Sequence, residues 1–175
     1  MNNENQPASP HKKNGKLMLI TAWIIALILL TKIFKPIEEA RYNPNTSPSS
    51  SSKNGSKQVF LKRNRQGHYV TSGSINGKKV VFLIDTGASE VSIPQQLANK
   101  LGLKAGVSQP RSTANGIIKV YMTRLNELSV GELSFSDIRA SINPHMKGET
   151  ILLGMSALKT IEFHQRGDVL TLTTY

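Results

Sequence analysis

The segment VVFLIDTGASEVSIP, from Val80 to Pro94, places one aspartate after five apolar residues and follows it with small and polar ones. An aspartate at the end of an apolar strand loses hydration free energy unless its neighbours satisfy the carboxylate or the protein uses its altered chemistry. Gly87 can form a tight turn that brings backbone N–H groups toward the carboxylate of Asp85, and the Thr86 hydroxyl can both donate and accept hydrogen bonds. The structural alternative is an ordinary β-turn, in which Asp-x-Gly is common.

Short β-like runs with turn signals between them extend around this segment, over residues 58–175. Asn76-Gly77 joins two such runs and predicts a two-residue hairpin. A helix is predicted over residues 94–102, with proline in its first turn and glycine at its end. A second short helical stretch is predicted near Met155. The pattern predicts a mostly β domain with one or two short helices.

The N-terminal part predicts a membrane anchor. Residues 1–16 are basic, and residues 17–34 form a mostly apolar run whose length approaches that needed to cross a bilayer. No small-x-small cleavage site follows it, so an uncleaved transmembrane helix is favoured, with a cleaved signal peptide as the alternative. The lysines before the run favour a cytoplasmic N-terminus and a domain across the membrane. Residues 35–57 are rich in Ser, Asn and Pro and predict a flexible linker.

The composition limits the partners and cofactors. The chain has 22 Lys and Arg and 11 Asp and Glu, a formal charge of +11, which raises nucleic acid or an anionic membrane surface as partners. The basic residues after Gln58 form no run and do not alternate with aromatic ones, so we expect no nucleic-acid binding. Cysteine is absent and the four histidines lie far apart in the sequence, so we expect no disulfide, no thiol chemistry and no metal site.

Three motifs together resemble the retropepsin family of aspartic proteases, in its single-lobed, membrane-anchored bacterial form. They are FLIDTGAS at residues 82–89, STANGIIKV at 112–120 and ILLGMSAL at 151–158, in the order and spacing of that family. The resemblance covers the β domain and implies a retropepsin-like closed β-barrel, the acid-protease lobe. It also implies a single-pass protein of the bacterial inner membrane with a periplasmic protease domain.

The resemblance assigns roles to individual residues. Asp85 resembles the catalytic aspartate, with Thr86, Gly87, Ala88 and Ser89 supporting the active-site loop. The flap that covers a bound peptide in that family matches Thr113, Ala114, Asn115 and Gly116. The strand packed behind the loop matches Leu153 and Gly154. No cofactor and no metal are implied.

Aspartic proteolysis requires two carboxylates that share a proton, and this chain has one such motif. Asp137 and Asp168 are not followed by Thr-Gly, so the second Asp85 is expected from another copy of the chain. The predicted function is a homodimeric endopeptidase acting on peptides or proteins, and the alternative is a non-catalytic dimerisation or peptide-binding module of the same fold. The last strand, VLTLTTY, is expected either in the dimer interface or in a hairpin within one subunit.

Overall fold

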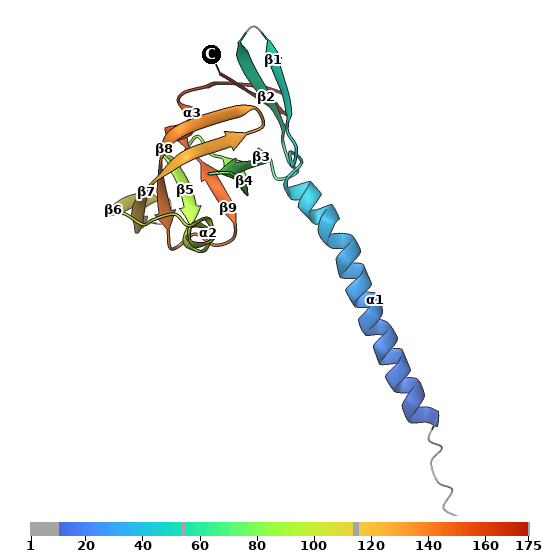
Figure 1. Ribbon diagram of the computed structural model, residues 1–175. Helices are drawn as coiled ribbons and strands as arrows, with labels where there is room; N and C mark the ends of the chain where they lie inside the picture. The colour runs from blue at the N-terminus through green and yellow to red at the C-terminus, as the bar shows by residue number, and fades with distance from the viewer. Residues whose placement is uncertain (1–10, 54, 114–115, 175) are drawn as a thin grey trace, which may run out of the picture. The chain divides into compact units, whose positions relative to one another are not determined.

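The computed structural model describes residues 11–53, 55–113 and 116–174 (Figure 1). The chain divides between Glu39 and Ala40 into two compact units. The first is mostly one helix, and the second is the β domain that carries the predicted site.

Helix α1 (His11–Tyr42) has 32 residues, which corresponds to about 48 Å at 1.5 Å per residue. Its part from Gly15 to Tyr42 is long and apolar enough to cross a membrane, and its side chains are not buried by the rest of the protein. A hydrocarbon core is about 30 Å thick. The predicted span of residues 17–34 therefore lies inside a helix that extends further at its C-terminal end.

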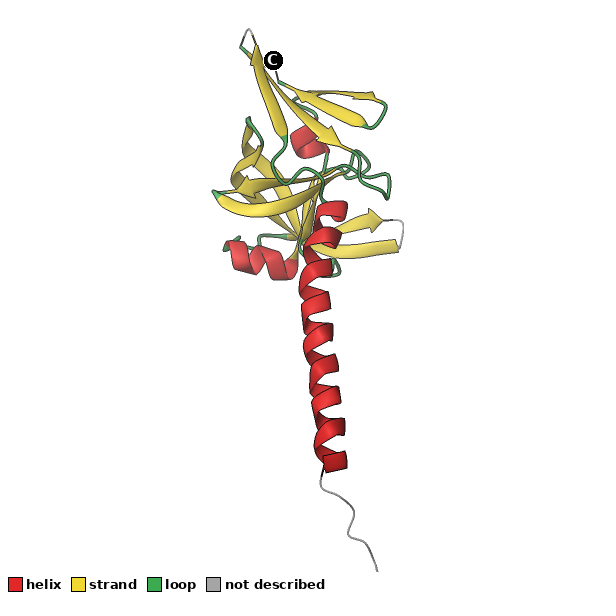
Figure 2. Ribbon diagram, turned by 90° about the vertical axis from the view of Figure 1, so that its right-hand side faces the viewer, coloured by secondary structure: helices red, strands yellow, loops and turns green. Residues whose placement is uncertain are grey.

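The β domain contains a closed barrel (Figures 1 and 2). Seven strands follow one another in one sheet, and a further pairing of the first strand with the sixth closes the ring. The order is β3 (Val70–Ile75), β4 (Lys78–Ile84), β9 (Thr150–Leu153), β5 (Val91–Pro94), β8 (Leu133–Asn143), β7 (Gly116–Val130) and β6 (Ser108–Thr113). The prediction of a closed, mostly β lobe is confirmed.

The ring closes where β3 meets β7, at a glycine. A Cβ atom on Gly73 would lie 2.1 Å from the backbone oxygen of Ser129 and 2.8 Å from the Phe82 ring. No larger residue fits there without moving the backbone. The predicted hairpin between β3 and β4 is also present, with Asn76 and Gly77 at φ values of 49° and 77°, as a type I′ turn requires.

A second sheet has four strands in the order β1 (Ser49–Lys53), β2 (Ser56–Lys62), β11 (Val169–Thr173) and β10 (Glu162–Arg166). Its buried side chains belong to the same hydrophobic core as those of the barrel; they are Val59, Leu61, Leu170 and Leu172. The C-terminal strand forms a hairpin with β10, one of its two expected arrangements, and also pairs with β2 of the same chain.

Two short helices cap the barrel strands, as predicted. Helix α2 (Gln95–Leu101) begins directly after Pro94 and ends at Gly102, whose φ of 76° is left-handed. Helix α3 (Met155–Leu158) follows Gly154. Because α3 comes immediately after β9, it lies next to the predicted active-site loop.

The structure differs from the predicted flexible linker over residues 35–57. Helix α1 continues to Tyr42, and residues from Ser49 onward form β1 and β2. Asn45 is buried; its side-chain amide donates to the carbonyls of Lys62 and Val70, and its Oδ1 accepts from the Lys62 N–H. A polar segment needs no apolar core of its own when it completes the hydrogen bonds of an existing sheet.

Candidate active site

Asp85 lies at the end of β4, beside the end of β9. The two strands run parallel, with Ile84 opposite Leu153. The Asp85 N–H donates to the Leu153 carbonyl at 3.1 Å, the Ala88 N–H donates to the Asp85 carbonyl at 3.2 Å, and the Met155 N–H donates to the Ala88 carbonyl at 2.8 Å. Backbone hydrogen bonds therefore fix the turn from both sides.

The carboxylate of Asp85 is bound by the turn that it begins. The Gly87 N–H donates to Asp85 Oδ1 at 2.9 Å, and Asp85 is partly exposed. A carboxylate held by a backbone donor and open to solvent can accept a proton from a bound water. This is the local arrangement that the sequence predicted for Asp85 and Gly87.

Gly154 allows the loop to pack directly on β9. A Cβ atom on Gly154 would lie 2.3 Å from the Glu90 carbonyl oxygen and 2.6 Å from the Ala88 carbonyl oxygen. Leu153, the residue before it, is fully buried. Leu153 and Gly154 thus lie behind the Asp85 loop, and their supporting role stays a prediction.

Thr86 and Ser89 are both exposed. Within the part of the chain that the structure describes, neither hydroxyl forms a hydrogen bond with the protein. In one copy of the chain they are free to bind another molecule.

The predicted flap is the hairpin of β6 and β7. Thr113 Oγ1 donates to the Gly116 carbonyl at 2.8 Å, and Gly116 has a φ of 105°, a conformation that favours glycine. Ala114 and Asn115, the other two predicted flap residues, lie outside the described residues. Thr113 and Gly116 pair at the end of this hairpin, and their role as a flap stays a prediction.

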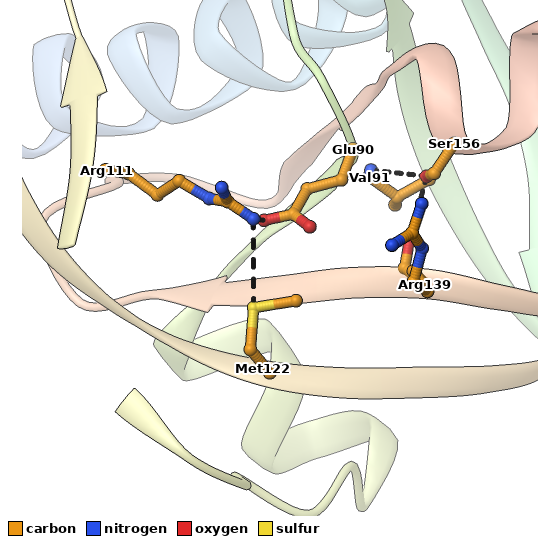
Figure 3. Close-up of polar contacts among 6 residues, drawn as sticks. All are labelled: Glu90, Val91, Arg111, Met122, Arg139 and Ser156. Carbon is orange, nitrogen blue, oxygen red and sulfur yellow. Dashed lines mark hydrogen bonds and ion pairs between the residues drawn. The ribbon is translucent and has the colours of Figure 1, made fainter. Parts of the chain in front are cut away.

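Sequence reasoning missed an ion pair between this hairpin and the Asp85 loop (Figure 3). Arg111 of β6 donates to Oε1 of Glu90, with Nε at 3.1 Å and Nη2 at 2.8 Å. The two residues are 21 positions apart, and no motif marks either of them. A charge alternation within one element can be read from a sequence, but a pair between a loop and a distant strand cannot.

Ser156 of α3 was also missed, and it fixes the start of β5. The Val91 N–H donates to Ser156 Oγ at 3.1 Å, and that hydroxyl donates to the Arg139 carbonyl at 2.8 Å (Figure 3). One hydroxyl thus connects α3, β5 and β8. The Asp85 loop is held at its end as well as in its middle.

The other two aspartates of the domain form ion pairs elsewhere. Asp137 of β8 accepts from Arg124 of β7 at 2.6 Å and 2.7 Å. Asp168, in the turn between β10 and β11, pairs with Arg63. Among the described residues, no cluster of three or more His, Asp and Glu side chains could hold a metal ion.

Two surface hollows lie away from the Asp85 loop. One of about 560 Å³ is lined by residues at the end of α2 and on β7 and β8, among them Leu103, Met122 and Arg139. Asp85 does not line it.

Comparison with known proteins agrees with the fold. Residues 71–160 match the family described as "gag-polyprotein putative aspartyl protease". The crystal structure of a retropepsin-like aspartic protease from Rickettsia conorii superposes with a TM-score of 0.59 and 30% sequence identity, over 73% of this chain and 96% of that one.

Two curated proteins are similar in sequence. An uncharacterized protein in the cobV 5′ region of Sinorhizobium sp is 29% identical over 94% of this chain and 76% of its own length. Uncharacterized protein RP867 of Rickettsia prowazekii (strain Madrid E) is 30% identical over 58% of this chain and 45% of its own length. With the family match over residues 71–160, the chain belongs to the retropepsin-like aspartic proteases.

Proposed function

We propose that this protein is a membrane-anchored, homodimeric aspartic endopeptidase whose active site contains one Asp85 from each of two copies. The observation that supports this most directly is the geometry of Asp85. Its carboxylate is open to solvent at the end of β4, and its turn is fixed by Leu153, Ala88 and Met155 through the backbone. The family membership supports a protease-type function for that carboxylate.

Peptide hydrolysis by this chemistry uses two carboxylates with one shared proton. One Asp85 accepts a proton from the attacking water, and the other protonates the carbonyl oxygen of the peptide bond. The second carboxylate is assigned to a second copy because Asp137 and Asp168 are engaged by Arg124 and Arg63. A two-fold axis brings the same loop from both copies to one place.

The other predicted site residues take supporting roles. Thr86 joins the loops of the two copies through its exposed hydroxyl, and Ala88 and Ser89 flank the substrate. Residues 113–116 cover the bound peptide, and Gly154 keeps the loop against β9. The reaction needs no cofactor and no metal, and its substrate is a peptide or protein.

Asp85→Asn tests the function. The amide keeps the shape of the side chain but cannot share the proton, so peptidase activity should fall by about 10³-fold or more while the melting temperature stays close to that of the wild type. Mixed with wild-type protein under subunit exchange, the variant should lower activity as the square of the wild-type fraction. A linear fall with demonstrated mixed dimers would contradict the shared dyad, and full activity of Asp85→Asn would contradict the assignment itself.

The proposed location is the bacterial inner membrane, with residues 1–16 in the cytoplasm, α1 as a single span and the protease domain in the periplasm. The apolar length of α1 and the lysines at its N-terminal end support this arrangement. The full chain should stay with membranes at alkaline pH, and its β domain should be digested by protease added from the periplasmic side. Recovery of a mature form that begins after Phe34 would support the signal peptide instead.

A further inference from the structure

The hairpin of β6 and β7 leaves the barrel as a two-stranded ribbon, here called the flap ribbon (residues 108–121). β6 pairs with residues 116–121 of β7, whereas the pairing of β7 with β8 starts at Tyr121 and continues away from the tip. In the described part of the ribbon, no other strand supports it beyond that point. Because an isolated two-stranded hairpin is marginally stable in water, the position of this ribbon depends on its side-chain contacts.

Glu90, the partner of Arg111 in the ion pair, lies on a rigid part of the Asp85 loop. Its carbonyl oxygen lies where a Cβ on Gly154 would clash, at 2.3 Å. The next residue, Val91, is fully buried and donates its N–H to Ser156. The carboxylate of Glu90 thus projects from a fixed backbone, five residues after Asp85.

The ion pair between Glu90 and Arg111 (Figure 3) is partly shielded from solvent. The Glu90 side chain is 12% exposed and the Arg111 side chain 39%. Both guanidinium donors reach one carboxylate oxygen, and Arg111 Nη2 lies 4.0 Å from Met122 Sδ on the neighbouring strand. Ion pairs of this kind are screened less than exposed ones, and loss of one partner leaves the other charge partly desolvated and unpaired.

We propose that the Glu90–Arg111 ion pair is a latch that holds the flap ribbon against the Asp85 loop, so that Arg111 is a positioning residue for the reaction. The inference rests on the proposed function for its effect on catalysis, but the latch itself is a property of the free protein. Opening the ribbon breaks this pair, while the backbone bonds within the hairpin remain. The pair therefore sets the population of the closed ribbon.

Hydrogen exchange of the full-length protein in detergent tests the latch without any substrate. In Arg111→Gln, amides of residues 108–121 should exchange about tenfold or more faster than in the wild type, because the closed state loses its charged contact. Arg124→Gln is the matched control. It breaks an ion pair between β7 and β8 outside the ribbon, with side chains that are 59% and 72% exposed, and it should leave the ribbon unchanged.

Activity measurements then test the link to catalysis. Arg111→Gln should lower kcat/KM by about tenfold or more, mainly through KM, because the closed state that covers the peptide is less populated. The kcat/KM of Arg111→Lys should lie between those of the wild type and Arg111→Gln, since lysine keeps the charge but not the planar set of donors. If Glu90 and Arg111 act as a unit, the double variant Glu90→Gln with Arg111→Gln should have a kcat/KM no lower than that of the less active single variant. The exchange of the two residues, Glu90→Arg with Arg111→Glu, should recover part of the lost activity.

The two proposals can fail separately. A wild-type protein that cleaves no peptide but whose ribbon loosens in Arg111→Gln would contradict the proposed function and leave the latch standing. Unchanged ribbon exchange in Arg111→Gln, or strictly additive effects of the Glu90 and Arg111 variants, would overturn the latch. Should Glu90→Gln fail to fold, Arg111→Gln alone decides through exchange, because its side chain is the more exposed partner.

Discussion

The Asp85 loop and the flap ribbon both carry predicted site residues, yet they are held in different ways. The loop is bound through its backbone to β9 and α3, and Gly154 lets it pack without space for a side chain. The ribbon is bound mainly to itself, with the Glu90–Arg111 pair as its charged contact to the loop. The Asp85 loop is therefore fixed by its backbone, whereas the position of the ribbon depends on side-chain contacts.

Replacing one glycine by alanine in each region tests this difference most directly. Gly154→Ala places a Cβ against two backbone oxygens, so the loop or α3 must shift. We expect a loss of about 3 kcal/mol in the free energy of unfolding, at the upper end for overpacking, together with loss of activity. Gly116→Ala should cost less, about 1 kcal/mol, because its Cβ meets open space and only the strain of its positive φ is unfavourable. Denaturant titration measures both, and equal losses would contradict the contrast.

Asn45→Ala tests residues 43–57, whose composition predicts a flexible linker. Asn45 nevertheless bonds backbone groups of neighbouring strands, as the Asp85 loop does. The variant leaves the Lys62 N–H and the Val70 carbonyl without their side-chain partner. We expect a loss of about 2 kcal/mol in unfolding free energy, measured in the full chain. Asn99→Ala is the control, because Asn99 is exposed on α2 and its side chain, within the described residues, bonds only Gln95. No difference between the two variants would mean that residues 43–57 do not belong to the folded domain.

The smallest effect is expected at Lys100 and Glu149, an exposed ion pair that contrasts with the partly shielded Glu90–Arg111 pair. The hydrogen bond and charge of Lys100 lower the pKa of Glu149 from its ordinary value of 4.5. Because the folded-state pKa is lowered, the pair stabilises the protein at pH values above the ordinary pKa. This stabilisation is lost as the pH falls through the folded-state pKa. Lys100→Gln should thus be slightly less stable than the wild type at neutral pH and equal to it in strong acid. A difference that persists at high salt would contradict this, since exposed pairs are screened.

The parts of the site that depend on neighbours in sequence could be predicted. Asn76-Gly77 determines its own turn by backbone conformation, and Gly102 determines the end of α2 in the same way. The turn after Asp85 also follows from local residue types, because Gly87 donates to the carboxylate two positions earlier. The catalytic role of Asp85 and the pairing of two copies stay predictions.

The parts of the structure that depend on residues distant in sequence could not be predicted. The composition of residues 43–57 indicated a flexible linker, because it has few apolar side chains. It did not reveal that Asn45 would find partners on β2 and β3. Glu90 and Arg111 carried no signal either, since neither lies in a motif and their contact exists only when β6 is placed beside the loop.

The sequence by itself determined the strand that ends at Asp85, the turn after it, the apolar N-terminal helix and the mostly β character of the domain. Those properties come from side-chain periodicity and backbone preference within a few residues. Only the tertiary structure decided that β3 closes the barrel on β7, that β11 lies between β2 and β10, and that an ion pair joins the flap ribbon to the Asp85 loop. Such contacts depend on which segments pack together, and their free energy is gained only after the chain has folded around a common core.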